Sequence, residues 1–150
     1  MKWLKLSLLA ATLILSQAAF AHTDEYLDTL TAPHGGQLRM AGSYHYELVV
    51  AKDSNGVKDN MVMVYVTDHA GNKILTKGAT GSATILAGKT KSTAILKADG
   101  DNGLKGSLKY ASNPDMKVVL VITMAGKPSE QARFTPLAVA KNDGHSEHKH

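Results

Sequence analysis

The chain contains 150 residues, carries a formal net charge of +4 when histidine is neutral, and has no cysteine. The absence of cysteine excludes disulfides, thiolate metal ligands and cysteine nucleophiles. No cluster of lysine and arginine with interleaved aromatic residues is present, so we exclude nucleic acid as a partner. The length between an N-terminal leader and a polar tail is sufficient for a single folded domain.

Residues 1–21 have the three parts of a cleavable secretory signal peptide. Lys2 and Lys5 supply positive charge, an apolar run covers residues 6–15, and the sequence A-F-A at 19–21 is a small-x-small cleavage signal. The apolar run is too short to span a bilayer. We therefore expect an exported, periplasmic protein that begins at His22 and is not inserted in the membrane after cleavage. Removal of two lysines and no acidic residue lowers the expected net charge to +2.

After a leader segment at 22–32, the chain alternates between short β-prone runs and turns rich in Gly, Asp and Asn, and no segment has a helical period. The expected strands are Gln37–Ala41, Tyr44–Ala51, Met61–Thr67, Lys73–Thr76, Ser82–Leu86, Ser92–Lys97, Leu104–Tyr110, Lys117–Met124 and Gln131–Thr135. Strands at this spacing are typical of a sandwich or barrel. We predict an all-β domain at 33–139, a single antiparallel β-sandwich of two sheets, Ig-like or cupredoxin-like. The polar tail at 140–150 is predicted to be disordered.

Alternation along a strand predicts which side chains face the core. In the run at 44–50 the even-numbered residues are the more apolar set, so His45 and Glu47 are expected on the more exposed face. The run beginning at Met61 is apolar on both faces and is expected in the centre of a sheet. Met61 and Met63 are accordingly predicted to pack in the core, where methionine commonly fills gaps.

The placement of histidine is the most informative feature of the chain. All seven histidines follow the leader, at His22, His34, His45, His69, His145, His148 and His150. Imidazole suits copper, zinc and nickel, and without thiolates a metal site must use nitrogen, carboxylate oxygen or methionine sulfur. The chain lacks a nucleophile elbow, an H-E-x-x-H motif and a phosphate-binding glycine loop. The sequence therefore predicts metal binding without enzyme activity.

Two candidate ligands lie before the first strand. Cleavage after residue 21 gives His22 a free α-amine beside its imidazole, a nitrogen pair that suits square-planar copper(II). The alternative is that His22 is a frayed, solvated terminus. His34 lies in a Pro-His-Gly-Gly turn that can hold an imidazole rigidly at a sheet end. The alternative is an ordinary exposed turn histidine.

The other candidates lie on or after strands. His45 and Glu47 are neighbours on one strand face, as ligand and carboxylate, or alternatively as part of a solvated face. Asp68 and His69 follow a strand and offer a carboxylate and an imidazole, although Asp68 alternatively caps the turn. Met40 is the one methionine retained as a candidate soft ligand. The three histidines of the tail are expected to capture metal weakly or to be inert.

Five short motifs carry a resemblance to a known group of proteins. They are A-P-H-G-G at 32–36, Y-H-Y-E-L-V-V at 44–50, V-Y-V-T-D-H-A-G at 64–71, G-A-T-G at 78–81 and A-R-F at 132–134. Together they make residues 33–137 resemble small exported proteins and efflux-associated domains of Gram-negative bacteria that handle heavy metals. Similar Pro-His-Gly-Gly segments occur in the periplasmic adaptors of metal-exporting pumps, which implies periplasmic metal binding or delivery. The expected sandwich and His22 also resemble periplasmic copper-resistance proteins, whose mature N-terminal histidine binds copper(II).

These observations predict a periplasmic metal-binding protein in metal homeostasis, resistance or delivery to efflux, with copper, zinc or nickel as the metal. The candidate ligands are His22, His34, His45, Glu47, Asp68 and His69. An efflux adaptor protein is a candidate partner. The first alternative is a protein-interaction module of the cell envelope with incidental histidines. A mononuclear copper oxidase built on His22 is the weakest alternative, because the mature chain has few aromatic residues with which to bind a polymer.

Overall fold

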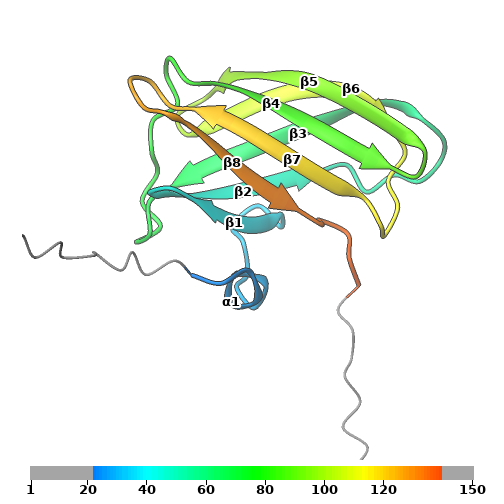
Figure 1. The fold of residues 1–150 in the computed structure, drawn as a ribbon, viewed down its shortest axis with the longest axis horizontal. Helices are drawn as coiled ribbons and strands as arrows, with labels where there is room; N and C mark the ends of the chain where they lie inside the picture. Colours follow the sequence, from blue (N-terminus) through cyan, green and yellow to red (C-terminus); the bar gives the residue numbers. More distant parts are fainter. Residues whose placement is uncertain (1–21, 140–150) are drawn as a thin grey trace, which may run out of the picture.

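The computed structural model describes residues 22–139, which contain one short helix and eight strands (Figure 1). The elements are α1 (Asp24–Asp28), β1 (Gln37–Ala41), β2 (Tyr44–Val50), β3 (Lys58–Thr67), β4 (Thr80–Ala87), β5 (Thr90–Asp99), β6 (Gly103–Tyr110), β7 (Lys117–Thr123) and β8 (Ser129–Phe134). The all-β prediction is confirmed. The predicted signal peptide and the histidine-containing tail lie outside the described residues.

All eight strands belong to one antiparallel sheet, in the order β1-β2-β3-β6-β5-β4-β7-β8. The prediction of two separate sheets is wrong, because β6 pairs with both β3 and β5 and thereby joins the two halves. The sheet curls until its first and last strands approach each other (Figure 1). Across this junction the hydroxyl of Tyr46 donates to Glu130 Oε2 at 2.8 Å, and the backbone N–H of Thr135 donates to Gln37 Oε1 at 2.9 Å.

The inner face of the curled sheet holds the core. In β3 the side chains of Val62, Val64 and Val66 are fully buried. The alternate side chains point outward, so Met61 is 52% exposed and Met63 is only partly buried. The prediction that both methionines pack in the core is therefore wrong, because no second layer formed by residues 22–139 covers this part of the outer face.

Eight of the nine expected strands are present, with ends that differ by a few residues. The exception is the run at 73–76, which contributes only one isolated bridge, between Thr67 and Lys73. After that bridge the chain turns away, and the buried Thr76 instead donates its hydroxyl to the Gly103 carbonyl at 2.8 Å. Two single backbone hydrogen bonds, from Ile74 to the Val66 carbonyl and from Thr76 to the Asp101 carbonyl, also anchor the run, but they do not form a continuous ladder.

The leader segment contains a helix that the sequence did not predict. Thr23 caps α1 by accepting the backbone N–H of Tyr26, and Leu27 is buried beneath it. The buried Arg39 of β1 donates to Asp28 Oδ1 at 2.7 Å and so fastens α1 to the sheet. A single helical turn is too short to show a hydrophobic period. In residues 22–139 no helix has the length and apolar character needed to cross a bilayer.

Candidate metal centre

Residues of the segment 22–36, namely His22, Leu30, Pro33 and His34, lie against the outer face of the sheet at β1, β2 and β3, and we call it the covered face. On it His45 is 8% exposed and Glu47 is 3% exposed. The prediction that these two residues lie on the more exposed face of β2 is wrong. The strand has the expected alternation, but the leader folds back over its polar side, so both faces of β2 are buried.

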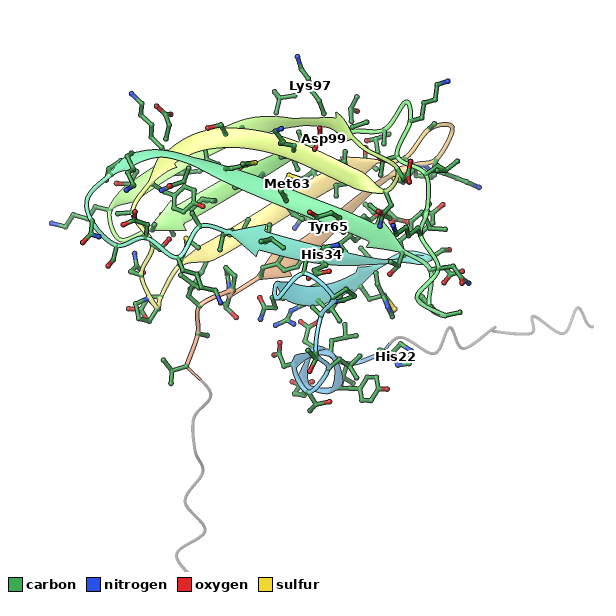
Figure 2. All side chains as sticks on the ribbon, turned by 180° about the vertical axis from the view of Figure 1, so that it is seen from behind. His22, His34, Met63, Tyr65, Lys97 and Asp99 are labelled. Atoms are coloured by element: carbon green, nitrogen blue, oxygen red, sulfur yellow. The ribbon has the colours of Figure 1, made fainter. Side chains whose placement is uncertain are left out.

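Three histidines from separate parts of the chain meet at one end of the covered face. His22 precedes α1, His45 lies in β2, and His69 lies in the turn after β3. The ring centres are 4.9 Å apart for His45 and His69, 5.6 Å for His22 and His45, and 5.9 Å for His22 and His69. Figure 2 shows His22 beside α1, at the start of the described chain. We call these three residues the histidine cluster.

The spacing of the cluster fits one metal ion. A metal about 2.0–2.1 Å from an imidazole nitrogen lies roughly 3.2 Å from the ring centre, so two rings on one metal have centres at most about 6.4 Å apart. All three observed separations are below that limit. Within residues 22–139, however, no group of three His, Asp or Glu side chains is arranged to hold a metal as it stands. The planes of His45 and His69 are inclined by only 19°, so these rings stack. Metal binding therefore requires the exposed rings of His22 and His69 to rotate.

His45 is the fixed member of the cluster. Its Nε2 is buried and has no hydrogen-bond partner among residues 22–139. A buried polar atom without a partner is costly, and this one belongs to the residue type that most often binds transition metals. Burial lowers the pKa of His45 below its usual value, and the neighbouring imidazoles of His69 and His22 lower it further. A neutral imidazole keeps a lone pair for a metal.

Two residues flank His45 across the strands. Met40 of β1 and Thr67 of β3 are its direct cross-strand partners. Directly opposite side chains share a face and have Cβ atoms about 4.5–5.5 Å apart. Met40 therefore brings a thioether to the same end of the covered face. It was the one methionine that the sequence suggested as a candidate soft ligand.

His34 has a different environment, two residues further along the covered face. Its Nδ1 donates to Glu47 Oε2 at 2.7 Å, and its ring stacks on Tyr65 with centres 3.6 Å apart and planes inclined by 9°. Figure 2 shows His34 next to Tyr65 of β3. The His34 side chain is nevertheless 41% exposed. We call His34, Glu47 and Tyr65 the His34 clamp.

Glu47 organises the turn that carries His34. Its Oε1 accepts the backbone N–H of His34 at 2.7 Å and that of Gly36 at 3.1 Å. A Cβ on Gly36 would collide with the backbone carbonyl of Leu48, so only glycine permits this close approach. With both oxygens engaged, Glu47 orients an imidazole, which is the role of the carboxylate in many carboxylate–histidine–metal arrangements.

Asp68 is engaged in the turn between β3 and His69. Its Oδ1 accepts the backbone N–H groups of Ala70 and Asn72, and its Oδ2 accepts the Asn72 side-chain amide at 2.9 Å. These hydrogen bonds, chiefly that from the Asn72 side chain, lower the pKa of Asp68. The arrangement is the turn cap that sequence reasoning gave as an alternative. Asp68 thus shapes the loop on which His69 sits.

A cavity of about 490 Å³ connects the cluster and the clamp. Its polar lining includes His34, His45, Glu47, Tyr65, His69, Lys73 and Asn102, and Leu30, Pro33 and Leu38 contribute apolar walls. Sequence reasoning missed Tyr65, Lys73 and Asn102. Only the strand register reveals Tyr65, because it pairs directly with Glu47.

Comparisons of this chain with protein-family models, with curated proteins and with solved structures found no significant match. The residues themselves therefore carry the functional argument. These residues form two groups beside one cavity. The histidine cluster supplies three imidazoles, and His34 supplies a fourth that is held by the carboxylate of Glu47. Neutral nitrogen donors in this number, without thiolates, suit copper, zinc or nickel.

Proposed function

We propose that this protein is a periplasmic, non-enzymatic metal-binding protein that holds one copper ion at the histidine cluster. The observation that carries the proposal is the buried Nε2 of His45, which has no hydrogen-bond partner and lies in a group of three imidazoles. A metal ion supplies the partner that this nitrogen lacks. His22 and His69 complete the ligand set from exposed positions.

Copper is favoured over zinc and nickel by the nature of His22. If signal peptidase cleaves after residue 21, the α-amine and the imidazole of His22 form a two-nitrogen chelate. Added to His45 and His69, this gives four nitrogen donors, a set that copper(II) prefers in a square plane. Met40, opposite His45, adds a thioether that suits copper(I).

The physiological role that fits is homeostasis, resistance or delivery to an efflux system. The resemblance to metal-handling periplasmic proteins and adaptor domains supports this role, as does a site built partly from exposed, exchangeable ligands. An efflux adaptor protein is the proposed partner. An Ig-like or cupredoxin-like relationship of the fold also stays a proposal, beyond the antiparallel all-β sheet itself.

The deciding experiment is isothermal titration of the processed protein with Cu(II), Zn(II), Ni(II) and Cu(I). Mass spectrometry first establishes that the exported chain begins at His22. We expect one Cu(II) ion per chain, bound at micromolar affinity or tighter, with nitrogen hyperfine structure in the electron paramagnetic resonance spectrum. Failure of all four metals to bind with micromolar affinity would overturn the proposal. A His148→Gln variant in the tail is the matched control and is expected to bind as tightly as the parent.

A second candidate function is an interaction module, favoured by exposed apolar residues on the uncovered part of the sheet. Met61, Ile95 and Val121 project from β3, β5 and β7, with Lys97 and Lys105 nearby. A triple His34, His45 and His69→Ala variant separates the two functions. Unchanged metal tolerance of the host together with unchanged partner capture would favour the interaction module.

A further inference from the structure

The His34 clamp leaves one nitrogen of His34 without an assigned task. Nδ1 is committed to Glu47, because a carboxylate accepts only from a ring nitrogen that carries the proton. In a neutral imidazole Nε2 then holds the lone pair. The ring cannot swing away easily, since it is stacked on Tyr65 and its backbone N–H is bound to the same carboxylate. The clamp therefore fixes both the tautomer and the plane of an imidazole.

This fixed imidazole is partly exposed to solvent and shares a cavity with two members of the histidine cluster. The His34 side chain is 41% exposed, and it lines the cavity that His45 and His69 also line. Glu47 and His45 are two residues apart on β2, so their positions on the covered face are about 7 Å apart. The ring of His34 stacks on Tyr65, whereas the rings of the cluster histidines contact one another. His34 is thus close to the cluster without belonging to it.

We propose that His34 is a transfer ligand, which takes metal from solvent or a partner and passes it across the cavity to the histidine cluster. This inference rests on the proposed function, since it presupposes a metal bound at the cluster. Transfer proceeds by exchange of one nitrogen for another: His34 Nε2 binds the ion while a cluster imidazole releases it, or the reverse. No electron and no proton is gained or lost by the protein in this step.

A transfer ligand has a distinct kinetic consequence. It lowers the barrier in both directions, so it speeds uptake and release by the same factor and leaves their ratio, the Kd, unchanged. A resident ligand behaves differently, because its loss raises the release rate and weakens the affinity. A merely structural His34 would alter neither the rates nor the Kd once its hydrogen bond to Glu47 is preserved.

The test uses the processed protein and two conservative variants. His34→Asn keeps an N–H donor for Glu47 and removes the Nε2 lone pair. Glu47→Gln keeps the ring in place but offers Nδ1 an N–H donor, which moves the ring proton to Nε2 and occupies the lone pair there. Stopped-flow measurement with Cu(II) and a chromophoric chelator gives the uptake and release rates, and their ratio is compared with the titrated Kd.

We expect each variant to slow both rates by about tenfold, a common effect of losing a group that supports a metal site, with the Kd retained. Unchanged rates would overturn the proposal, and so would a weakened Kd with faster release, which would make His34 a resident ligand. The matched variant His69→Asn is expected to show that second pattern. If the parent protein binds no copper, the proposed function itself fails, which is a separate and recognisable result.

Discussion

The histidine cluster and the His34 clamp lie on the same face of the sheet, yet they treat their nitrogen atoms in opposite ways. In the clamp, Nδ1 of His34 has a carboxylate partner at 2.7 Å and the ring is stacked on Tyr65. In the cluster, the Nε2 of His45 is buried and has no hydrogen-bond partner in the part of the chain that the structure describes. In the folded protein the Nδ1 of His34 thus has a hydrogen-bond partner, whereas the Nε2 of His45 lacks one among the described residues. The comparison indicates that the clamp is built for position and the cluster for a ligand that arrives later.

The largest expected effect on metal affinity comes from substitution in the histidine cluster. Replacing His45 with Gln should weaken Cu(II) binding about 100-fold, because the buried anchor of the cluster is lost. The same change should alter the free energy of unfolding of the metal-free protein only slightly, since no hydrogen bond of the ring is broken. Titration calorimetry and urea unfolding measure the two effects. Equal losses of binding and of stability would show that His45 is a structural residue and not a ligand.

In the His34 clamp, substitution should affect the stability of the metal-free protein more than its metal affinity. Glu47→Ala removes the acceptor of three N–H groups and is expected to cost about 2 kcal/mol of unfolding free energy. Glu47→Gln, which keeps the backbone N–H groups of His34 and Gly36 satisfied, is the control and should cost less. Urea unfolding of the two metal-free variants gives the difference. A neutral Glu47→Ala substitution would contradict the clamp.

The contribution of the His22 amine can be isolated by blocking that amine chemically. Because an added residue would bring a new amine, the variant is the processed chain acetylated at the α-amine of His22, which loses the amine donor and keeps every side chain of the cluster. We expect Cu(II) affinity to fall about tenfold and Zn(II) affinity to change less, because copper(II) has the stronger preference for planar nitrogen chelation. Competition titrations of both chains with both metals measure the two ratios. Equal effects on the two metals would remove the chelate from the proposal.

The smallest expected effect concerns the helix that carries His22. The hydrogen bond from Arg39 holds the pKa of Asp28 below its usual value of 3.8. The unfolded chain therefore takes up this proton first as the pH falls, so stability is present above pH 3.8 and is lost below it. Because Asp28 is about half exposed, the contribution should be roughly 1 kcal/mol or less.

An Asp28→Asn variant tests that contribution. It should be slightly less stable than the parent at pH 6, and the difference should be smaller at pH 3, because the unfolded chain already carries a proton on Asp28 there. Unfolding curves at the two values of pH give the comparison. A constant difference between the two proteins would show that the charge of Asp28 does not contribute.

The sequence predicted the positions of the strands better than it predicted which strand faces are buried by other segments. Alternation along β2 correctly separates His45 and Glu47 from Tyr46 and Leu48, because a strand reverses its side chains at every residue. Nothing in that alternation shows that the leader folds back over the polar side. The same limit applies to β3, where Met61 is apolar and yet exposed. Burial depends on a neighbouring layer, and that layer comes from distant parts of the chain.

In the candidate site, too, the sequence predicted some features and missed others. Six candidate ligands followed from the sequence, and the fold brings the rings of three of them, His22, His45 and His69, within 6 Å of one another. The pairing of His34 with Glu47 was not predicted, because it depends on where the turn at 33–36 lies against β2. Long-range register determines such contacts, and a single sequence does not contain it in readable form.

Strand β2 has a consequence for how this protein tolerates change. Its odd-numbered residues His45 and Glu47 serve the covered face, while Tyr46 and Leu48 fill the core, and Tyr46 also joins β2 to Glu130 of β8. Most strands of this sheet have one face open to water, where substitutions are cheap. Over residues 45–48, β2 has no such face. Its evolution should therefore be slow at four consecutive positions, in contrast to the every-other-residue pattern of a strand such as β6.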